Sequence, residues 1–131
     1  IIDALANAGR RPEDVDYIST WGTGHKLIDA SESYSLKKIF GARLSDIPAS
    51  SSKGSIGIAL GASGAIQSIS VALSLQRGII PPSVNWETPD PDCPLNLSIS
   101  PRYINAGVAV VNTHGVSGSN AALVIEQACL Q

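Results

Sequence analysis

Side chains able to do chemistry gather in three glycine-rich segments of this sequence. The first segment, residues 20–25, contains Trp21 and His25 and is followed by two carboxylates, Asp29 and Glu32. These carboxylates are three residues apart, so a helix would place them one turn from each other. The segment therefore brings a histidine and a carboxylate pair within a few residues of a flexible loop.

The other two segments are 52–65, which contains Lys53, and 112–120, which contains His114. Histidine can exchange a proton near neutral pH, so both histidines are candidates for acid–base work. Residue types alone favour a plainer interpretation, in which the carboxylates and the lysine are solvated charges at helix ends. A histidine in a loop is, likewise, more often a surface residue than a catalyst.

The two cysteines, Cys93 and Cys129, have neither the spacing of a metal site nor the density of a disulfide scaffold. We therefore expect no metal and no cofactor, and a reducing cytoplasm as the location.

The regular elements that must position these segments begin with a helix over 1–9, ended by Gly9. The alternation of residues 14–19 predicts a strand that leads into the first glycine-rich segment, and the ends of strands are where sites usually form. Apolar spacing over 27–40 predicts an amphipathic helix that stops at Gly41.

Residues 57–77 are small and apolar, which predicts a helix that is buried nearly all round. Gly57, Gly61 and Gly64 lie at helical offsets, and each glycine costs a helix about 1 kcal/mol relative to alanine. Close approach of another backbone would explain them, and a frayed start to the helix is the alternative.

The remainder is a proline-rich excursion over 81–94, followed by strands over 107–112 and 121–127 joined by a turn at 115–118. We expect Trp86, within the excursion, to fill core volume. Long helices between apolar strands predict an α/β fold: a mixed sheet with a buried central helix in a layered αβα arrangement.

Composition limits the classes of partner. Apolar residues make up 44% of the 131 residues and charged residues only 15%, which suits a single domain that buries one side against another protein. A net charge of −2 argues against nucleic acid or an anionic membrane as a partner, and no apolar run is long enough to span a membrane. Because the sequence starts at Ile1 and has no methionine, we expect a piece of a longer protein.

The three segments, in their order and separations, resemble motifs of the C-terminal half of the β-ketoacyl synthases of the thiolase superfamily. Residues 20–25 resemble the family's His-Gly-Thr-Gly-Thr loop, 52–65 its Lys-Ser-x-x-Gly-His-x-x-Gly-Ala-x-Gly motif, and 112–120 its Asn-Ser-Phe-Gly-Phe-Gly-Gly-Thr-Asn motif. The resemblance runs almost end to end, and it implies that 1–131 form the C-terminal half of a thiolase-like fold. The nucleophilic cysteine of such enzymes belongs to the N-terminal half, which is outside this chain.

The resemblance also implies that the catalytic imidazoles are absent. Synthases of this family use two histidines to stabilise oxyanions, and their positions are occupied here by Trp21 and Ile58. Loss of one oxyanion donor typically costs about 10²- to 10³-fold in rate. With Trp21 and Ile58 in place of both histidines, we therefore expect no appreciable condensation. Lys53, Asp29 and Glu32 match a polar network that the family keeps beneath its site.

Two further positions concern the acyl pocket of the resembled enzymes. His114 stands where the family has a phenylalanine that lines the pocket, and Val116 replaces the phenylalanine gate. Trp21 could plug the pocket, which would limit the length of a bound chain. A minority interpretation is that His25 or His114 rescues catalysis.

A synthase half without its catalytic groups most resembles the chain length factor of type II polyketide systems. Such a subunit is expected to pair with its own N-terminal half, with an active ketosynthase subunit in a heterodimer, and with an acyl carrier protein. The alternatives are an active 3-oxoacyl carrier-protein synthase with an atypical site, serving fatty-acid or polyketide biosynthesis, and an independent scaffold module.

Overall fold

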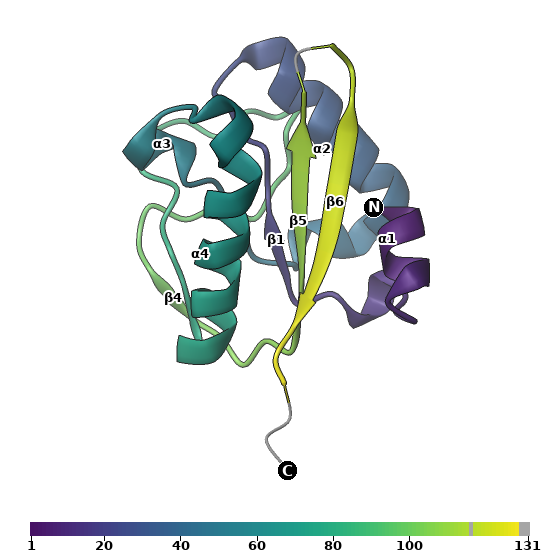
Figure 1. Ribbon diagram of the computed structural model, residues 1–131. Helices are drawn as coiled ribbons and strands as arrows, with labels where there is room; N and C mark the ends of the chain where they lie inside the picture. Colours follow the sequence, from purple (N-terminus) through teal and green to yellow (C-terminus); the bar gives the residue numbers. More distant parts are fainter. Residues whose placement is uncertain (116, 129–131) are drawn as a thin grey trace.

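A four-stranded sheet forms the centre of the computed structural model, which describes residues 1–115 and 117–128 (Figure 1). The strands are β1 (Tyr17–Ser19), β2 (Ala49–Ser50), β5 (Val108–His114) and β6 (Asn120–Glu126). They lie in the order β2-β1-β5-β6. β1 is parallel to β2 and β5, whereas β5 and β6 are antiparallel. The predicted mixed sheet is therefore confirmed, with β5 and β6 as its closing hairpin.

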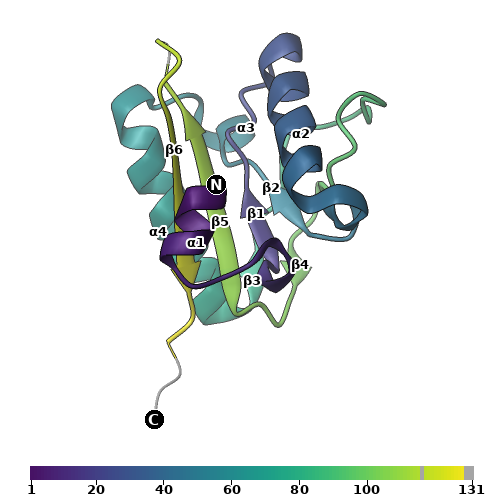
Figure 2. The same ribbon diagram turned by 90° about the vertical axis from the view of Figure 1, so that its right-hand side faces the viewer.

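Helices cover both faces of this sheet. α1 (Ile2–Asn7) and α2 (Lys26–Phe40) lie on one face and α4 (Ser63–Arg77) on the other (Figure 2). The remaining elements are short: 3₁₀ turns at Pro12–Asp14, Gly41–Ser45 and Leu60–Ala62, the helix α3 (Lys53–Ile56), and the strands β3 (Ile79–Ile80) and β4 (Arg102–Tyr103). The predicted layered αβα arrangement is confirmed.

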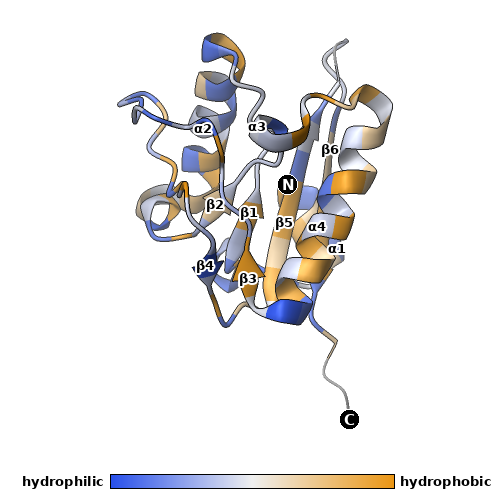
Figure 3. Ribbon diagram, turned by 90° about the vertical axis from the view of Figure 1, so that its left-hand side faces the viewer, coloured by the Kyte–Doolittle hydropathy of each residue, from blue (hydrophilic) through white to orange (hydrophobic). Residues whose placement is uncertain are grey.

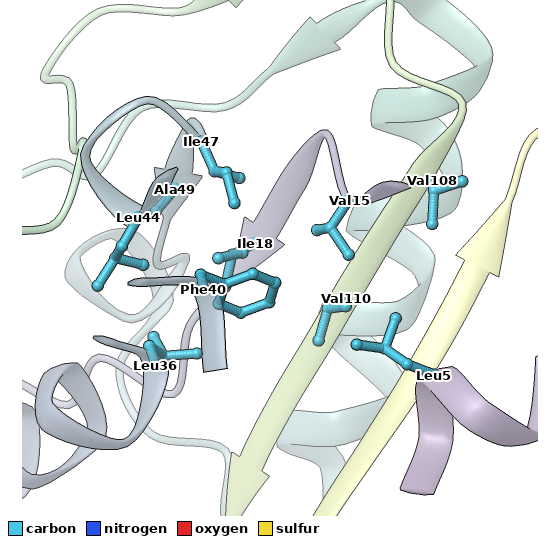
Figure 4. Close-up of a cluster of buried hydrophobic side chains, with 10 residues drawn as sticks. All are labelled: Leu5, Val15, Ile18, Leu36, Phe40, Leu44, Ile47, Ala49, Val108 and Val110. Atoms are coloured by element: carbon cyan, nitrogen blue, oxygen red, sulfur yellow. The ribbon is translucent and has the colours of Figure 1, made fainter. Parts of the chain in front are cut away.

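Alternating residues of the strands divide the core into two parts, as the two-residue period of a strand requires. On the face under α1 and α2, Ile18 and Val110 pack with Leu36 and Phe40 (Figure 4). On the other face, their strand neighbours, including Val111, pack against α4. The central strands β1 and β5 are thus buried on both sides over most of their length, and the loops at their carboxyl ends emerge at one edge.

The helix predicted over 57–77 starts later than expected. α3 ends at Ile56 with Gly57 as its C-cap, a 3₁₀ turn follows at Leu60–Ala62, and α4 begins only at Ser63. Gly57 has a φ of +73°, which a helix interior cannot accommodate. Gly57 therefore lies outside α4 and caps the preceding helix. Close approach of another backbone does not explain Gly57 or Gly61, because no atom lies within 4 Å of a Cβ placed at either glycine.

Close backbone approach occurs instead at Gly54, within α3. A Cβ atom there would collide with the carbonyl oxygen of Val84. Asn85 Nδ2 also donates to the Gly54 carbonyl at 2.9 Å. This glycine therefore lets the proline-rich excursion pack directly on α3.

The expectation that the central helix is buried nearly all round is wrong for this chain. Ile69 is 62% exposed and Leu73 is 42% exposed, although Val71 and Leu75 on the same helix are buried. Hydrophobic residues lie along β5 and on α4 (Figure 3). None of the helices in the described residues is long and apolar enough to cross a membrane.

Leu36→Ala should destabilise the fold by roughly 2–5 kcal/mol, because Leu36 is fully buried between α2 and the sheet. Leu27→Ala on the same helix is the matched control, since Leu27 is 75% exposed and its loss should cost less than about 0.5 kcal/mol. Denaturant midpoints of the two variants measure the difference; equal midpoints would contradict this packing.

Candidate functional site

The carboxylate of Glu32 fixes the loop after β1. Its Oε1 accepts the Trp21 N–H at 2.8 Å, and its Oε2 accepts the Gly22 N–H at 3.0 Å. Oε1 also accepts Asn112 Nδ2 of β5 at 2.6 Å. Glu32 is only 2% exposed, so the interpretation of this residue as a solvated charge is wrong.

Asp29, one turn earlier on α2, holds the next part of the same loop. Its Oδ1 accepts the Thr23 N–H at 3.0 Å and its Oδ2 accepts the Gly24 N–H at 2.9 Å. Asp29 also lies in the first turn of the helix, where the helix dipole favours a negative charge. Two carboxylates thus anchor four consecutive backbone N–H groups, from Trp21 to Gly24.

Lys53, at the start of α3, is buried beside this loop with 7% of its surface exposed. Its Nζ lies 4.1 Å from the centre of the Trp21 ring and 3.4 Å from Gln67 Oε1. Burial lowers the pKa of Lys53 to about 8, despite the opposing effect of the Glu32 and Asp29 charges. A substantial fraction of this amine is therefore neutral in mildly alkaline solution.

Gln67 links the three segments, a role that the sequence did not suggest. Its Nε2 lies 2.9 Å from the Thr20 carbonyl, 3.2 Å from the Asn112 carbonyl and 3.3 Å from Ser19 Oγ. Gln67 is 2% exposed. The available signal was a long amide side chain within an otherwise small and apolar helix.

His114 lies at the edge of Trp21, with ring centres 6.4 Å apart and an angle of 87° between the rings. His114 Nε2 lies 3.1 Å from Asn112 Nδ2 and accepts its hydrogen bond in the tautomer that carries the proton on Nδ1. In that tautomer Nδ1 donates to Asn120 Oδ1. Both ring nitrogens are engaged within this structure.

The other predicted site residues are placed differently. His25 is exposed at the start of α2, where its side chain makes no capping hydrogen bond. Ile58 is 49% exposed, in the stretch between α3 and the following 3₁₀ turn. Val116, the predicted gate, lies outside the described residues.

Two cavities flank the pair formed by Trp21 and Lys53. The larger, of about 770 Å³, is lined by Lys53, by the glycine loop and by the proline-rich excursion, including Trp86 and Cys93. The smaller, of about 390 Å³, is lined by Trp21 and His114 together with the start of α4. Within residues 1–115 and 117–128, no cluster of three histidine, cysteine, aspartate or glutamate side chains is suited to a metal ion.

Comparison with protein families gives a match to the C-terminal domain of β-ketoacyl synthases over residues 1–87. The chain belongs to the β-ketoacyl synthase family. The glycine-rich segments 20–25 and 52–65 both lie inside the matched region. The residues that support the family assignment therefore include these two segments.

Relatives of this β-ketoacyl synthase chain come from both nodulation and polyketide systems. Nodulation protein E of Rhizobium meliloti is 37% identical over 124 residues, covering 94% of this chain and 31% of the relative. The tetracenomycin polyketide synthase ketoacyl synthase alpha subunit of Streptomyces glaucescens is 41% identical over 96 residues, covering 73% of this chain and 22% of the relative. The chain therefore spans less than a third of the length of these relatives.

Solved ketosynthases share the fold. The ishigamide ketosynthase/chain length factor superposes with a TM-score of 0.90 at 30% identity, covering 95% of this chain and 31% of that one. A type II polyketide acyl carrier protein in complex with its ketosynthase bound to the hexaketide gives 0.94 at 32% identity, covering 98% and 32%. The predicted thiolase-like ketosynthase fold is confirmed.

Glu32→Gln should destabilise the chain by roughly 1–3 kcal/mol, because the amide offers one acceptor oxygen to the three donors that Glu32 now satisfies. Glu87→Gln makes the same chemical change at an exposed residue and should be nearly neutral. Unfolding midpoints near pH 7 measure both. An equal, small effect of the two substitutions would show that the loop does not depend on Glu32.

Proposed function

We propose that this chain is the C-terminal part of a non-catalytic ketosynthase-like subunit, a chain length factor. It pairs with an active 3-oxoacyl carrier-protein synthase and shapes the tunnel that holds the growing acyl or polyketide chain. The observation that carries this proposal is that Trp21 and Ile58 stand at the positions of the two family imidazoles, while Glu32 and Asp29 still hold the loop that contains Trp21.

The replacements remove the chemistry without removing the framework. The indole of Trp21 can donate one hydrogen bond but cannot take up a proton, and Ile58 can do neither. Since one lost oxyanion donor typically costs about 10²- to 10³-fold, two losses leave little condensation. The retained network of Lys53, Asp29 and Glu32 then serves the shape of the subunit.

Trp21 is our candidate for the residue that limits the tunnel. Its ring lies 4.1 Å from Lys53 Nζ and edge-on to His114. It lines the smaller cavity, whereas Lys53 lines the larger one, so a large aromatic ring stands at the wall of the smaller space. We therefore assign Trp21 the role of a wall that sets the available chain length.

Exposed apolar side chains support the proposed assembly. They lie on and around α3 and α4: Ile56, Ile58, Leu60, Ile69 and Leu73. A surface of this kind is usually covered in the working protein. We assign this surface to contact with the N-terminal half of the subunit. In the proposed assembly, the ketosynthase partner and the acyl carrier protein bind to the complete subunit.

The second candidate is an active synthase with an atypical site, in which a histidine replaces the lost pair. His114 favours it by position, since it lies against Trp21. Its two nitrogens are already engaged by Asn112 and Asn120, and His25 is exposed and lines neither cavity. The non-catalytic function is therefore preferred.

Trp21→Ala in the full-length subunit, co-expressed with its ketosynthase partner and carrier protein, should shift the products toward longer chains. The reason is that the indole lines the smaller cavity, so its removal should enlarge that space. Mass spectrometry of carrier-bound products measures the shift. Tyr103→Ala, which removes an 85% exposed aromatic ring, is the control and should leave the products unchanged.

If Trp21→Ala leaves the products unchanged in a heterodimer that assembles normally, the wall function is refuted. If the full-length subunit fails to bind any ketosynthase partner and condenses by itself, the second candidate replaces the first.

A further inference from the structure

Three polar side chains meet on one face of the hairpin that β5 and β6 form (Figure 1). Asn112 and His114 are two residues apart on β5, so their side chains point to the same face of the strand. Asn120 of β6 is the direct cross-strand partner of His114, which puts its side chain on that face as well. The geometry of the hairpin therefore places an amide on each side of one imidazole.

These two amides hold the His114 ring by both of its nitrogens. Nε2 lies 3.1 Å from Asn112 Nδ2, and Nδ1 lies within hydrogen-bond distance of Asn120 Oδ1. A second partner orients each amide. Asn112 Nδ2 also donates to Glu32 Oε1 at 2.6 Å, and Asn120 Nδ2 donates to the Gly118 carbonyl at 3.3 Å. Both orientations suit the neutral tautomer that carries the proton on Nδ1.

The turn beyond His114 keeps the two strands together at this level. The Gly115 N–H donates to the Ser119 carbonyl at 2.6 Å. A Cβ atom at Gly115 would collide with Ser119 Oγ, so a larger residue there would force the strands apart. Asn120 is consequently held opposite His114.

The His114 ring lies against the indole of Trp21. Their centres are 6.4 Å apart and their planes 87° apart, which is the edge-to-face arrangement that aromatic rings favour. The indole also has Lys53 Nζ at 4.1 Å from its centre. A lysine side chain is a flexible four-carbon stem, whereas the His114 ring is fixed by two hydrogen bonds. His114 is therefore the more rigid of these two neighbours.

Glu32 connects the backbone of residue 21 to the ring beside its side chain. The same Oε1 atom accepts the Trp21 N–H at 2.8 Å and the Asn112 amide at 2.6 Å. The position of the Trp21 backbone and the orientation of His114 thus depend on one carboxylate.

We propose that His114, held between Asn112 and Asn120, is a positioning residue that keeps the Trp21 indole in the orientation that bounds the smaller cavity. Trp21, His114 and Asn120 all line that cavity. The consequence rests on the proposed function: if Trp21 limits the chain, the orientation of its indole sets where the limit falls. An imidazole suits this role because a phenyl ring offers neither amide a hydrogen bond.

Fluorine NMR of the full-length subunit labelled with 5-fluorotryptophan tests the positioning of Trp21. The resonance that disappears in Trp21→Phe belongs to this residue. Asn120→Ala removes one amide and leaves His114 in place, so it should shift or broaden the Trp21 resonance. Asn105→Ala is the matched control: Asn105 is exposed, lies before β5 and lines neither cavity, so the resonance should not change.

A double substitution separates positioning from a general disturbance of the hairpin. With His114→Phe in place, neither amide can bind the ring, so the addition of Asn120→Ala should cause no further shift. An unchanged Trp21 resonance in Asn120→Ala would overturn the proposal. So would a shift of the same size with and without His114. If His114→Phe does not fold, the comparison of Asn120→Ala with Asn105→Ala still decides.

The carrier-bound products of the assembled heterodimer test the consequence separately. Asn120→Ala should give a wider spread of chain lengths than the wild type, as measured by mass spectrometry. A shifted Trp21 resonance with unchanged products would support the positioning by His114 and refute the function of Trp21 as a wall.

Discussion

One buried carboxylate holds the site of this chain together. Glu32 reaches from α2 to accept hydrogen bonds from the Trp21 and Gly22 backbone and from the Asn112 side chain on β5. A buried carboxylate is tolerated only when donors replace its lost hydration, and these three donors do so. The loop after β1, the helix and the central strand are consequently tied together by hydrogen bonds that do not involve the Trp21 side chain.

Under the proposed function, this constraint explains how the fold would persist without the family imidazoles. Glu32 and Asp29 bind the backbone of residues 21–24, so their hydrogen bonds do not require a particular side chain at position 21. Gln67 also links these elements: its Nε2 donates to the Thr20 and Asn112 carbonyls, and its Oε1 accepts a hydrogen bond from Lys53. The network thus fixes the geometry of the loops, and it includes Lys53, one of the residues that line the larger cavity.

The architecture and the three site segments could be predicted from the sequence, because strand alternation, glycine stops and motif order are local signals. The break between α3 and α4 could not be predicted. The apolar pattern around Gly57 is the same whether the backbone continues as a helix or turns at a positive φ. Burial of α4 was overestimated, because Ile69 and Leu73 are apolar but face outward in this chain. The role of Gln67 could not be foreseen, since its partners come from 45 or more residues away along the chain, apart from Lys53.

The central claim is that the framework of a condensing site survives here without its chemistry. The most direct measurement is release of CO₂ from malonyl carrier protein by the full-length subunit alone, with no ketosynthase partner present. The account predicts a rate no higher than the uncatalysed background, because it assigns Trp21 and Ile58 to the positions of the two family imidazoles. Release at the rate of an active synthase, abolished by His114→Gln, would contradict it and would make His114 the group that replaces them.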